Sequence, residues 1–301
     1  MAAVMERQRI AVRPTGAALG ADIEGIDLAR GLSPDTVGAI KQAWSDHLVL
    51  RFRGQHLDDD QLMRFSACFG ELDWAPVIAA LRAKVPGQDR FVEPAEEGRR
   101  YISVISNIIE NGRAVGALGA YESIWHTDMS YNPQPPSASA LYALEVPPSG
   151  GDTGFANMYL AYETLPEALL GLIRGRLCRH DATHNSAGEL RRGFTEVTDP
   201  RRTPGADHPI IRTHPVTGRK ALFLGRRRNA CIQGLELEES ERLLDALWAH
   251  ATRPELTWYQ QWQVGDLVLW DNRCVLHRRD EFDPATRRLM HRSQIKGDRP
   301  F

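Results

Sequence analysis

Two side chains with metal-binding groups lie two residues apart in a stretch that favours extended backbone. They are His126 and Asp128, in Trp125-His126-Thr127-Asp128. Side chains at positions i and i+2 of an extended chain project from the same face, so an imidazole and a carboxylate can reach one ion there. The pair is weak evidence by itself, because the chain has 10 histidines and many aspartates.

His277 is the candidate third ligand. It lies on an extended stretch that follows an apolar strand and a polar turn, Gly265 to Cys274. Two neutral imidazoles and one carboxylate on one face of an ion leave other coordination positions open, an arrangement that suits iron(II) activating dioxygen. His277 could instead be a core histidine whose ring nitrogens are hydrogen-bonded, and the residues alone leave both interpretations open.

Arg288 follows His277 by eleven residues, within Arg287-Arg288-Leu289-Met290-His291-Arg292. A planar guanidinium can bind a carboxylate through two parallel hydrogen bonds, so this segment is a candidate anion site. Arg292 is four residues from Arg288, an even number, so the two share a face if the strand has no bulge. The alternative is that these arginines form surface ion pairs.

The composition describes the kind of protein that must position these groups. Of 301 residues, 42% are hydrophobic and 25% charged, which is typical of a globular chain. A net charge of -2 gives no electrostatic footprint for nucleic acid, and Arg226-Arg227-Arg228 is too short to supply one. No long apolar run and no leader-like segment appear, so we expect a cytoplasmic protein that binds neither membrane nor nucleic acid. The 4 cysteines have no paired spacing, which indicates reduced, mostly buried thiols.

The patterning predicts a strand-rich chain with a few helices. Ser33 as cap and Pro34 in the first turn predict a helix to about Asp46, and a second helix is expected over Leu57 to Phe69. Two segments, Ala79 to Arg100 and Glu110 to Gly119, are expected to be loops. The remaining expected elements are strands at 9–12, 22–28, 48–52, 101–106, 255–263, 266–270 and 289–295, a hairpin at 209–224 and a helix at 236–251.

Several other residues carry no predicted chemistry. His180 and His184 have a helical i, i+4 spacing, but their segment favours strand and loop, so surface or structural roles are expected. His214 precedes the turn of the expected hairpin and is placed on its surface. Trp125, Trp262 and Trp270 are expected in the core.

Five motifs occur in order along the chain and carry a family resemblance. They are Trp125-His126-Thr127-Asp128, Pro147-Pro148-Ser149-Gly150-Gly151-Asp152-Thr153, Trp270-Asp271-Asn272-Arg273, His277 and Arg287-Arg288-Leu289-Met290-His291-Arg292. In these motifs and in the earlier stretch Gly20 to Leu28, the chain resembles the taurine dioxygenase and aryloxyacetate (2,4-dichlorophenoxyacetate) dioxygenase family. The resemblance covers nearly the whole chain.

The resemblance implies a fold and a set of site residues. The fold would be mainly β with flanking helices, a double-stranded β-helix or jelly roll, in a single domain over 1–301 whose N-terminal segment 1–100 packs on a barrel at 101–301. His126, Asp128 and His277 would be the iron ligands. Thr153 and Arg288 would bind the distal carboxylate of 2-oxoglutarate, and Arg292 would face the anionic end of the substrate or the other carboxylate of the cosubstrate.

The implied activity is oxidative hydroxylation with iron(II), 2-oxoglutarate and dioxygen, which releases succinate and carbon dioxide. The substrate would be a small organic anion such as an aryloxyalkanoate, a sulfonate or a sulfate ester, and a homo-oligomer is expected. The chain departs from the taurine enzyme at Tyr121 to Ile124, where that enzyme has an asparagine-rich segment, and Asn107 with Asn111-Gly112 is more similar to the aryloxyacetate branch.

Two alternative functions remain open from the residues alone. A zinc hydrolase also uses two histidines and a carboxylate, but it needs a general-base carboxylate near the metal and has no use for Arg288 or Thr153. A non-catalytic jelly-roll protein that binds a small acid would consume no oxygen.

Overall fold

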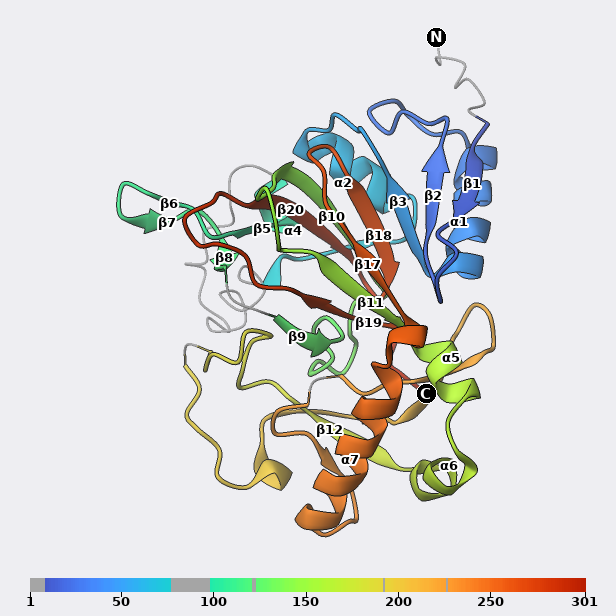
Figure 1. The fold of residues 1–301 in the computed structure, drawn as a ribbon, viewed down its shortest axis with the longest axis vertical. Coiled ribbons are helices and arrows are strands. Elements are labelled where there is room, and N and C mark those ends of the chain that lie inside the picture. Colours follow the sequence, from blue (N-terminus) through green and yellow to red (C-terminus); the bar gives the residue numbers. More distant parts are fainter. Residues whose placement is uncertain (1–8, 77–97, 121–122, 192, 226) are drawn as a thin grey trace, which may run out of the picture.

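The computed structural model describes residues 9–76, 98–120, 123–191, 193–225 and 227–301. The chain forms two main β-sheets that lie above a region of helices and short strands (Figure 1). The structure is therefore mainly β with few helices, as expected. Among the described helices, none combines the length and apolar character needed to cross a bilayer.

The N-terminal elements occur in the predicted order, although the first strand is shifted by two residues and the second ends at Glu24 rather than Leu28. They are β1 (Ala11–Pro14), β2 (Ala21–Glu24), α1 (Pro34–His47), β3 (Val49–Phe52) and α2 (Asp59–Ala67). Helix α1 begins where predicted, because the Ser33 side chain accepts a hydrogen bond from the backbone N–H of Thr36. Helix α2 begins two residues later than predicted, because Asp58 and Gln61 form a capping box that defines its first turn.

The larger sheet has the strand order β1-β2-β3-β18-β10-β20-β5-β8, with β4 beside β20. The strands not yet given are β4 (Leu72–Asp73), β5 (Ile102–Ser106), β8 (Ala117–Leu118), β10 (Ala138–Glu145), β18 (Leu267–Asp271) and β20 (Leu289–Ile295). Strand β18 is apolar on both faces, because Leu267 and Leu269 pack with α1 and α2 while Val268 and Trp270 pack in the inner cluster.

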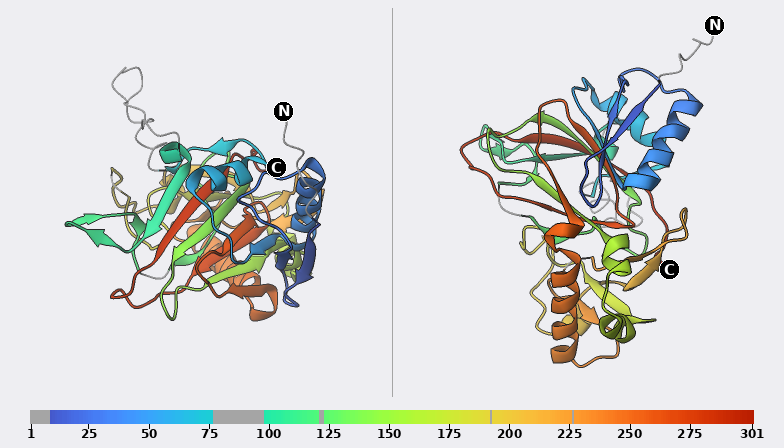
Figure 2. Two further views of the ribbon diagram at one scale, coloured as in Figure 1. Left: turned by 90° about the horizontal axis from the view of Figure 1, so that it is seen from above. Right: turned by 45° about the vertical axis from the view of Figure 1, so that its right-hand side comes forward.

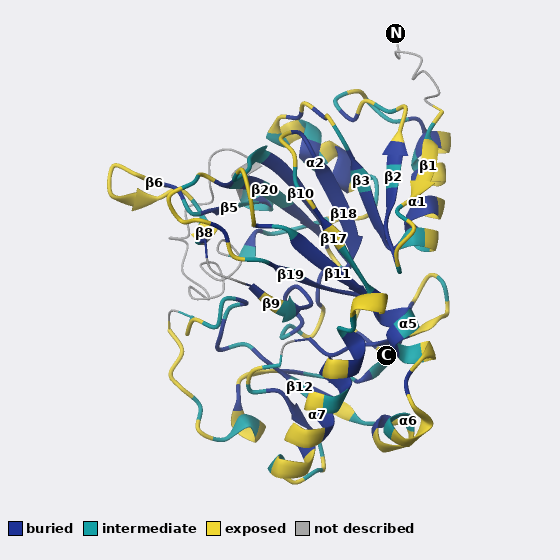
Figure 3. Cartoon of the chain, in the orientation of Figure 1, coloured by how far each residue is buried: buried dark blue, intermediate teal, exposed yellow. Residues whose placement is uncertain are grey.

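The smaller sheet has the order β17-β11-β19-β9. Its strands are β9 (Ser123–His126), β11 (Thr153–Asn157), β17 (Thr257–Gln260) and β19 (Val275–Arg279). Phe155 of β11 lies 5.6 Å, between ring centroids, from Trp270 of the larger sheet. The inner faces of the two sheets are therefore in contact, and Figure 3 shows that the residues of β10, β18, β11 and β19 are largely buried.

A long insertion separates β11 from β17 and forms the lower part of the molecule (Figure 2). It holds α5 (Met158–Glu163), α6 (Glu167–Ile173), β12 (Leu177–Asp181), β13 (Gly205–Pro209), β14 (Ile211–Thr213), β15 (Lys220–Leu222), β16 (Cys231–Ile232) and α7 (Leu237–Ala251), with short 3-10 helices at Pro200–Arg202 and Pro254–Leu256. The predicted hairpin is β14–β15, and the predicted C-terminal helix is α7. Arg227 forms ion pairs with Glu241 and Asp245 of that helix.

Of the two predicted loops, one contains strands, and most of the other lies outside the described residues. The segment Glu110 to Gly119 is not a plain loop, because β6 (Ile109–Glu110) and β7 (Arg113–Ala114) form a hairpin and β8 pairs with β5. Asn111 and Gly112 have φ of 51° and 74°, the left-handed backbone that a two-residue Asn-Gly hairpin turn requires. Most of the loop predicted from Ala79 lies outside the described residues, and its end forms the helical turn α4 (Gly98–Tyr101).

Candidate metal centre

Strands β9 and β19 bring the two predicted histidine ligands together. His126 and His277 are direct partners in the antiparallel ladder, and their ring centroids are 4.1 Å apart. The Nε2 atoms of His126 and His277 lie 3.8 Å and 3.9 Å from Oδ1 of Asp128. All three side chains are buried, and one ligand atom from each lies within 4.8 Å of the other two. The three residues singled out in the sequence therefore form one compact cluster.

Asp128 reaches this cluster in a different way from the one predicted. Strand β9 ends at His126, and Asp128 begins the turn that follows it. Met129, next in the chain, has φ of 46°, a conformation that non-glycine residues rarely adopt. The carboxylate is thus aimed by a tight turn rather than by strand alternation.

Two residues of the larger sheet donate hydrogen bonds to the Asp128 carboxylate. Ser139 of β10 donates from Oγ to Oδ2 at 2.7 Å, and an Nη atom of Arg292 on β20 lies 3.0 Å from Oδ1 and 3.2 Å from Oδ2. Burial opposes ionisation of this carboxyl, but the positive charge of Arg292 and the hydrogen bond from Ser139 favour the ionised form, and its pKa lies below the ordinary value. Asp128 is therefore a carboxylate, the form that binds a cation.

The tautomer of His126 also fits a metal. Its Nδ1 lies 2.7 Å from the carbonyl oxygen of Ile124, so Nδ1 carries the proton and donates it. Nε2 is then left with its lone pair on the side of Asp128. Imidazoles that bind metals characteristically donate the other ring N–H in this way, so the donor set fits a divalent cation.

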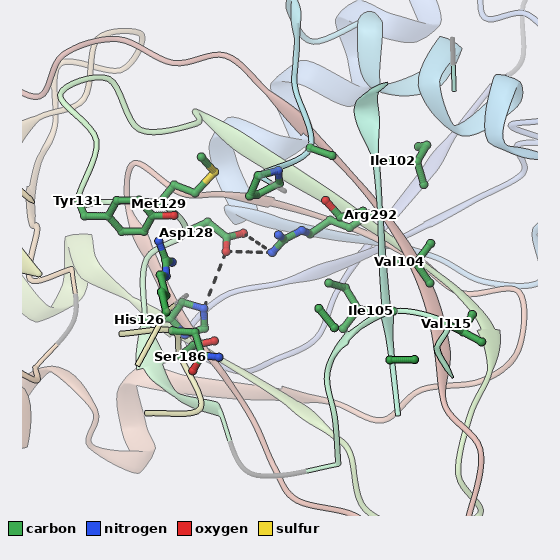
Figure 4. Close-up of a pocket in the computed structure, with 18 residues that line it drawn as sticks. Ile102, Val104, Ile105, Val115, His126, Asp128, Met129, Tyr131, Ser186 and Arg292 are labelled. Carbon is green, nitrogen blue, oxygen red and sulfur yellow. Dashed lines mark hydrogen bonds and ion pairs between the residues drawn. The ribbon is translucent and has the colours of Figure 1, made fainter. Parts of the chain in front are cut away.

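Two cavities contact the cluster, and Figure 4 shows the residues that line the larger one. The larger, about 410 Å³, is bordered by His126, Asp128 and Arg292. Its other wall is mostly apolar and includes Ile102, Val104, Ile105, Val115, Met129 and Tyr131. The insertion contributes Ser186 and Arg191, which the sequence did not single out. The smaller cavity, about 50 Å³, is bordered by His126 and His277 on one side and by Thr153, Arg279, Arg288 and Arg292 around it.

Arg288 is buried at the smaller cavity, with 1% of its surface exposed. Its backbone N–H donates to Oδ1 of Asn107 at 3.0 Å, while no carboxylate of the described residues lies within ion-pair distance of its guanidinium. Burial and the nearby Arg279 lower the pKa of Arg288 to about 9. A buried guanidinium is costly when it has no counterion, so an anion bound in this cavity would stabilise the arrangement.

Thr153 and Arg292 also line the smaller cavity. Thr153 begins β11, and its Oγ accepts a hydrogen bond from the indole N–H of Trp262 at 2.9 Å. Trp262, expected only as core, therefore orients a site residue. Arg288 and Arg292 share a face, as predicted from their spacing, since both line this cavity. The contact between Arg292 and Asp128 was not predicted, and no signal in the sequence indicated it.

A second cluster with metal-binding groups, formed by His214, Asp271 and Cys274, has a structural role instead. Both oxygens of Asp271 accept hydrogen bonds from Arg273, at 2.8 Å and 2.6 Å, and His214 Nε2 lies 3.1 Å from one of them. Nδ1 of His214 accepts from the backbone amides of Val216 and Thr217. The Asp271 carboxylate and both ring nitrogens of His214 are thus already engaged in hydrogen bonds within the protein. The surface position predicted for His214 is wrong, because the hairpin folds inward and buries the ring against Asp271.

This second cluster gives a stability prediction. Replacing Asp271 by Ala should lower the free energy of unfolding by about 3–5 kcal/mol, because it leaves Arg273 buried without its counterion. Urea unfolding followed by circular dichroism measures the change. Asp245→Ala is the control, because the exposed pair with Arg227 should cost about 1 kcal/mol or less. Equal losses in the two variants would contradict this account.

Comparisons with known proteins identify the family to which the chain is similar. A family model described as taurine catabolism dioxygenase TauD, TfdA family matches residues 11–294. An alpha-ketoglutarate-dependent 2,4-dichlorophenoxyacetate dioxygenase from Burkholderia sp. (strain RASC) is 35% identical over 285 residues, 92% of this chain and 91% of the relative. An (S)-phenoxypropionate/alpha-ketoglutarate-dioxygenase from Delftia acidovorans is 33% identical and covers 95% of this chain and 94% of the relative.

A solved structure extends the similarity to three dimensions. The crystal structure of AAD-2 in complex with Mn(II) and N-oxalylglycine superposes with a TM-score of 0.74 at 30% identity, over 97% of this chain and 99% of that one. The match to the family model and the identity to full-length relatives lead to the same assignment. The chain belongs to the TauD, TfdA family of dioxygenases.

Proposed function

We propose that this protein is an iron(II)-dependent enzyme that uses 2-oxoglutarate and dioxygen to hydroxylate a small, largely apolar organic anion, with release of succinate and carbon dioxide. One observation carries the proposal: the cluster of His126, Asp128 and His277 lies between an apolar cavity of about 410 Å³ and a small cavity lined by Arg288. The first has room for a substrate, and the second for one end of a dicarboxylate.

His126, Asp128 and His277 would hold the iron through Nε2, a carboxylate oxygen and an imidazole nitrogen. Bound iron(II) supplies the redox chemistry that activates dioxygen and oxidises a carbon of the substrate. Ser139 and Arg292 keep the Asp128 carboxylate ionised and oriented, and the Ile124 carbonyl keeps the His126 ring in the required tautomer. Ser139 and Arg292 thus act on the metal only through the ligand Asp128.

Thr153 and Arg288 would bind the distal carboxylate of 2-oxoglutarate. The Thr153 hydroxyl accepts the Trp262 indole N–H, so its own proton is available to donate to the carboxylate. Arg288 offers a planar fork of donors in a site from which water is largely excluded. Together these groups orient the keto acid end of the molecule toward the metal ligands.

The larger cavity indicates the substrate class. Ile102, Val104 and Val115 present apolar groups to it (Figure 4), which favour a hydrophobic body, and Arg292 favours an anion. An aryloxyalkanoate fits this combination, and the two relatives named above act, by their names, on aryloxyalkanoates. Part of the segment Tyr121 to Ile124, where the chain departs from the taurine enzyme, lies outside the described residues.

The zinc hydrolase alternative lacks one of its requirements. A general-base carboxylate should lie near the metal, yet Asp128 is the only acidic residue among those described along the two cavities. A buried Arg288 facing the cluster also has no role in hydrolysis. The dioxygenase relatives favour the oxidative chemistry as well.

The architecture supports a further part of the proposal. The two sheets pack face to face with the metal cluster between them, which supports a double-stranded β-helix. Strands β1 to β3 belong to the same sheet as β10, β18 and β20, which supports one domain over 1–301. A homo-oligomer and a cytoplasmic location stay predictions.

A substrate comparison tests the proposed function. With iron(II) and 2-oxoglutarate present, oxygen uptake and succinate formation should be stimulated more by an aryloxyacetate than by taurine, because the cavity wall is apolar rather than rich in amides. An alkyl sulfate and a neutral aryl ether complete the panel. A preference for taurine would contradict the assigned substrate class, and a preference for the neutral ether would contradict the role of Arg292. No oxygen uptake with any of the four would favour a non-catalytic acid-binding protein.

A further inference from the structure

We propose that Arg279 is a second guanidinium for the distal carboxylate of 2-oxoglutarate, so that this end of the cosubstrate is bound by two arginines, Arg279 and Arg288, rather than one. This inference rests on the proposed function, since it concerns the same small cavity. It adds a residue that lies on the strand carrying the metal ligand His277.

The strand register places Arg279 on the site side of the smaller sheet. In the ladder between β11 and β19, Thr153 is the direct partner of Arg279 and Phe155 is the partner of His277, with no shift between them. Direct partners in an antiparallel ladder project to the same face, as do residues two apart on one strand. Arg279, Thr153 and His277 therefore face the space between the two sheets.

Burial and contacts place the Arg279 side chain beside Arg288. Only 7% of Arg279 is exposed, and both arginines line the cavity of about 50 Å³. Their guanidinium carbons lie 5.5 Å and 6.0 Å from the centroid of the same ring, Phe282. Burial lowers the pKa of Arg279 to about 10, and its charge contributes to lowering the pKa of Arg288.

A carboxylate bound in this small, buried space would lie beside two positive charges, and both attract it. A carboxylate has two oxygens with about four acceptor positions, so it can accept donors from Thr153 and from both arginines. The cavity of about 50 Å³ has room for only a few water molecules, so it can take one end of a ligand but not a whole substrate. The position thus fits the distal carboxylate group of a keto dicarboxylic acid.

The test compares two keto acids that differ in that group alone. Protein loaded with manganese(II) is titrated calorimetrically with 2-oxoglutarate and with 2-oxopentanoate, which has a methyl group in place of the distal carboxylate. Arg279→Gln should weaken 2-oxoglutarate binding about 10- to 100-fold, the range expected for losing hydrogen bonds to a charged group. Binding of 2-oxopentanoate should change by less than about twofold, because the lost donor has no partner in that ligand.

Arg212→Gln is the matched control. Arg212 is also buried, lies 4.8 Å from a phenylalanine ring centroid and has a pKa lowered to about 10, but it does not line either cavity at the metal cluster. It should leave the ratio of the two affinities unchanged. Equal weakening of both keto acids by Arg279→Gln, or an unchanged ratio, would overturn the inference, because a purely structural role predicts that result.

A second variant keeps the test decisive if the glutamine variant does not fold. Arg279→Lys keeps the positive charge but loses the planar guanidinium that can bind a carboxylate through two parallel hydrogen bonds. It should weaken 2-oxoglutarate binding by about 3- to 10-fold and leave 2-oxopentanoate binding unchanged. An unchanged affinity ratio in this variant would equally overturn the inference. If the unaltered protein failed to distinguish the two keto acids, the proposed cosubstrate site itself would be wrong, an outcome distinct from a failure of Arg279 alone.

Discussion

Replacing His277 by Ala should abolish 2-oxoglutarate-dependent oxygen uptake, and the same is expected for His126→Ala and Asp128→Ala. Each change removes one of three protein ligands from a site with open coordination positions. Substitutions of outer residues around metal sites typically cost about 10- to 100-fold, so loss of a ligand should cost at least about 100-fold. Oxygen-electrode assays with saturating iron(II), together with the bound metal content, measure the effect.

The matched control is His250→Ala, which removes a buried histidine on α7 that hydrogen-bonds the Ala161 carbonyl. This variant should keep its iron and its activity. Circular dichroism should show that the ligand variants stay folded, since the inner cluster around Phe155 and Trp270 remains intact. Normal turnover by folded His277→Ala protein would show that the ligand assignment is wrong.

Arg288→Ala should raise the concentration of 2-oxoglutarate needed for half-maximal rate by a large factor. Removing one partner of a buried charged pair costs about 2–5 kcal/mol, which corresponds to roughly 30-fold to several thousandfold in affinity. Arg288→Lys should recover part of the loss, because an ammonium keeps the charge but cannot bind through two parallel hydrogen bonds. Saturation curves at fixed substrate concentration measure both.

Arg287→Ala is the control for Arg288. Arg287 is the preceding residue, but its exposed side chain pairs with Glu145 on the surface of the molecule. Its removal should leave saturation by 2-oxoglutarate unchanged, since exposed ion pairs contribute little. If Arg288→Ala and Arg287→Ala gave the same curves as the unaltered protein, Arg288 would not be the anchor.

Local chemistry explains which elements could be predicted from the sequence. The cap at Ser33 and the continuous apolar run of β18 depend on neighbouring residues, so their positions follow from a short window. The Asn111-Gly112 turn is equally local, and it could have predicted the hairpin that was expected as a loop. Asp128 clusters with His126 and His277, but the extended-strand argument that grouped it with them was incomplete, because a positive φ at Met129 cannot be anticipated from the residue type.

Contacts between residues far apart in the chain could not be predicted in this way. Ser139 is a small polar residue in an apolar strand, and its bond to Asp128 depends on how β10 faces the smaller sheet. The inward position of His214 depends likewise on the packing of its hairpin against Asp271.

By itself, the sequence determined the chemical types and order of the site residues: two histidines, one aspartate, one threonine and the basic segment that ends at Arg292. It also determined a mainly β chain, because alternation and turn residues act over a few positions. Only the tertiary structure decided that Arg292 contacts Asp128, that Arg288 is buried with no counterion among the described residues, and that Arg279 joins Thr153 and Arg288 at one cavity. The physical reason is that register and sheet packing set which distant side chains meet, and local residue patterns do not specify either.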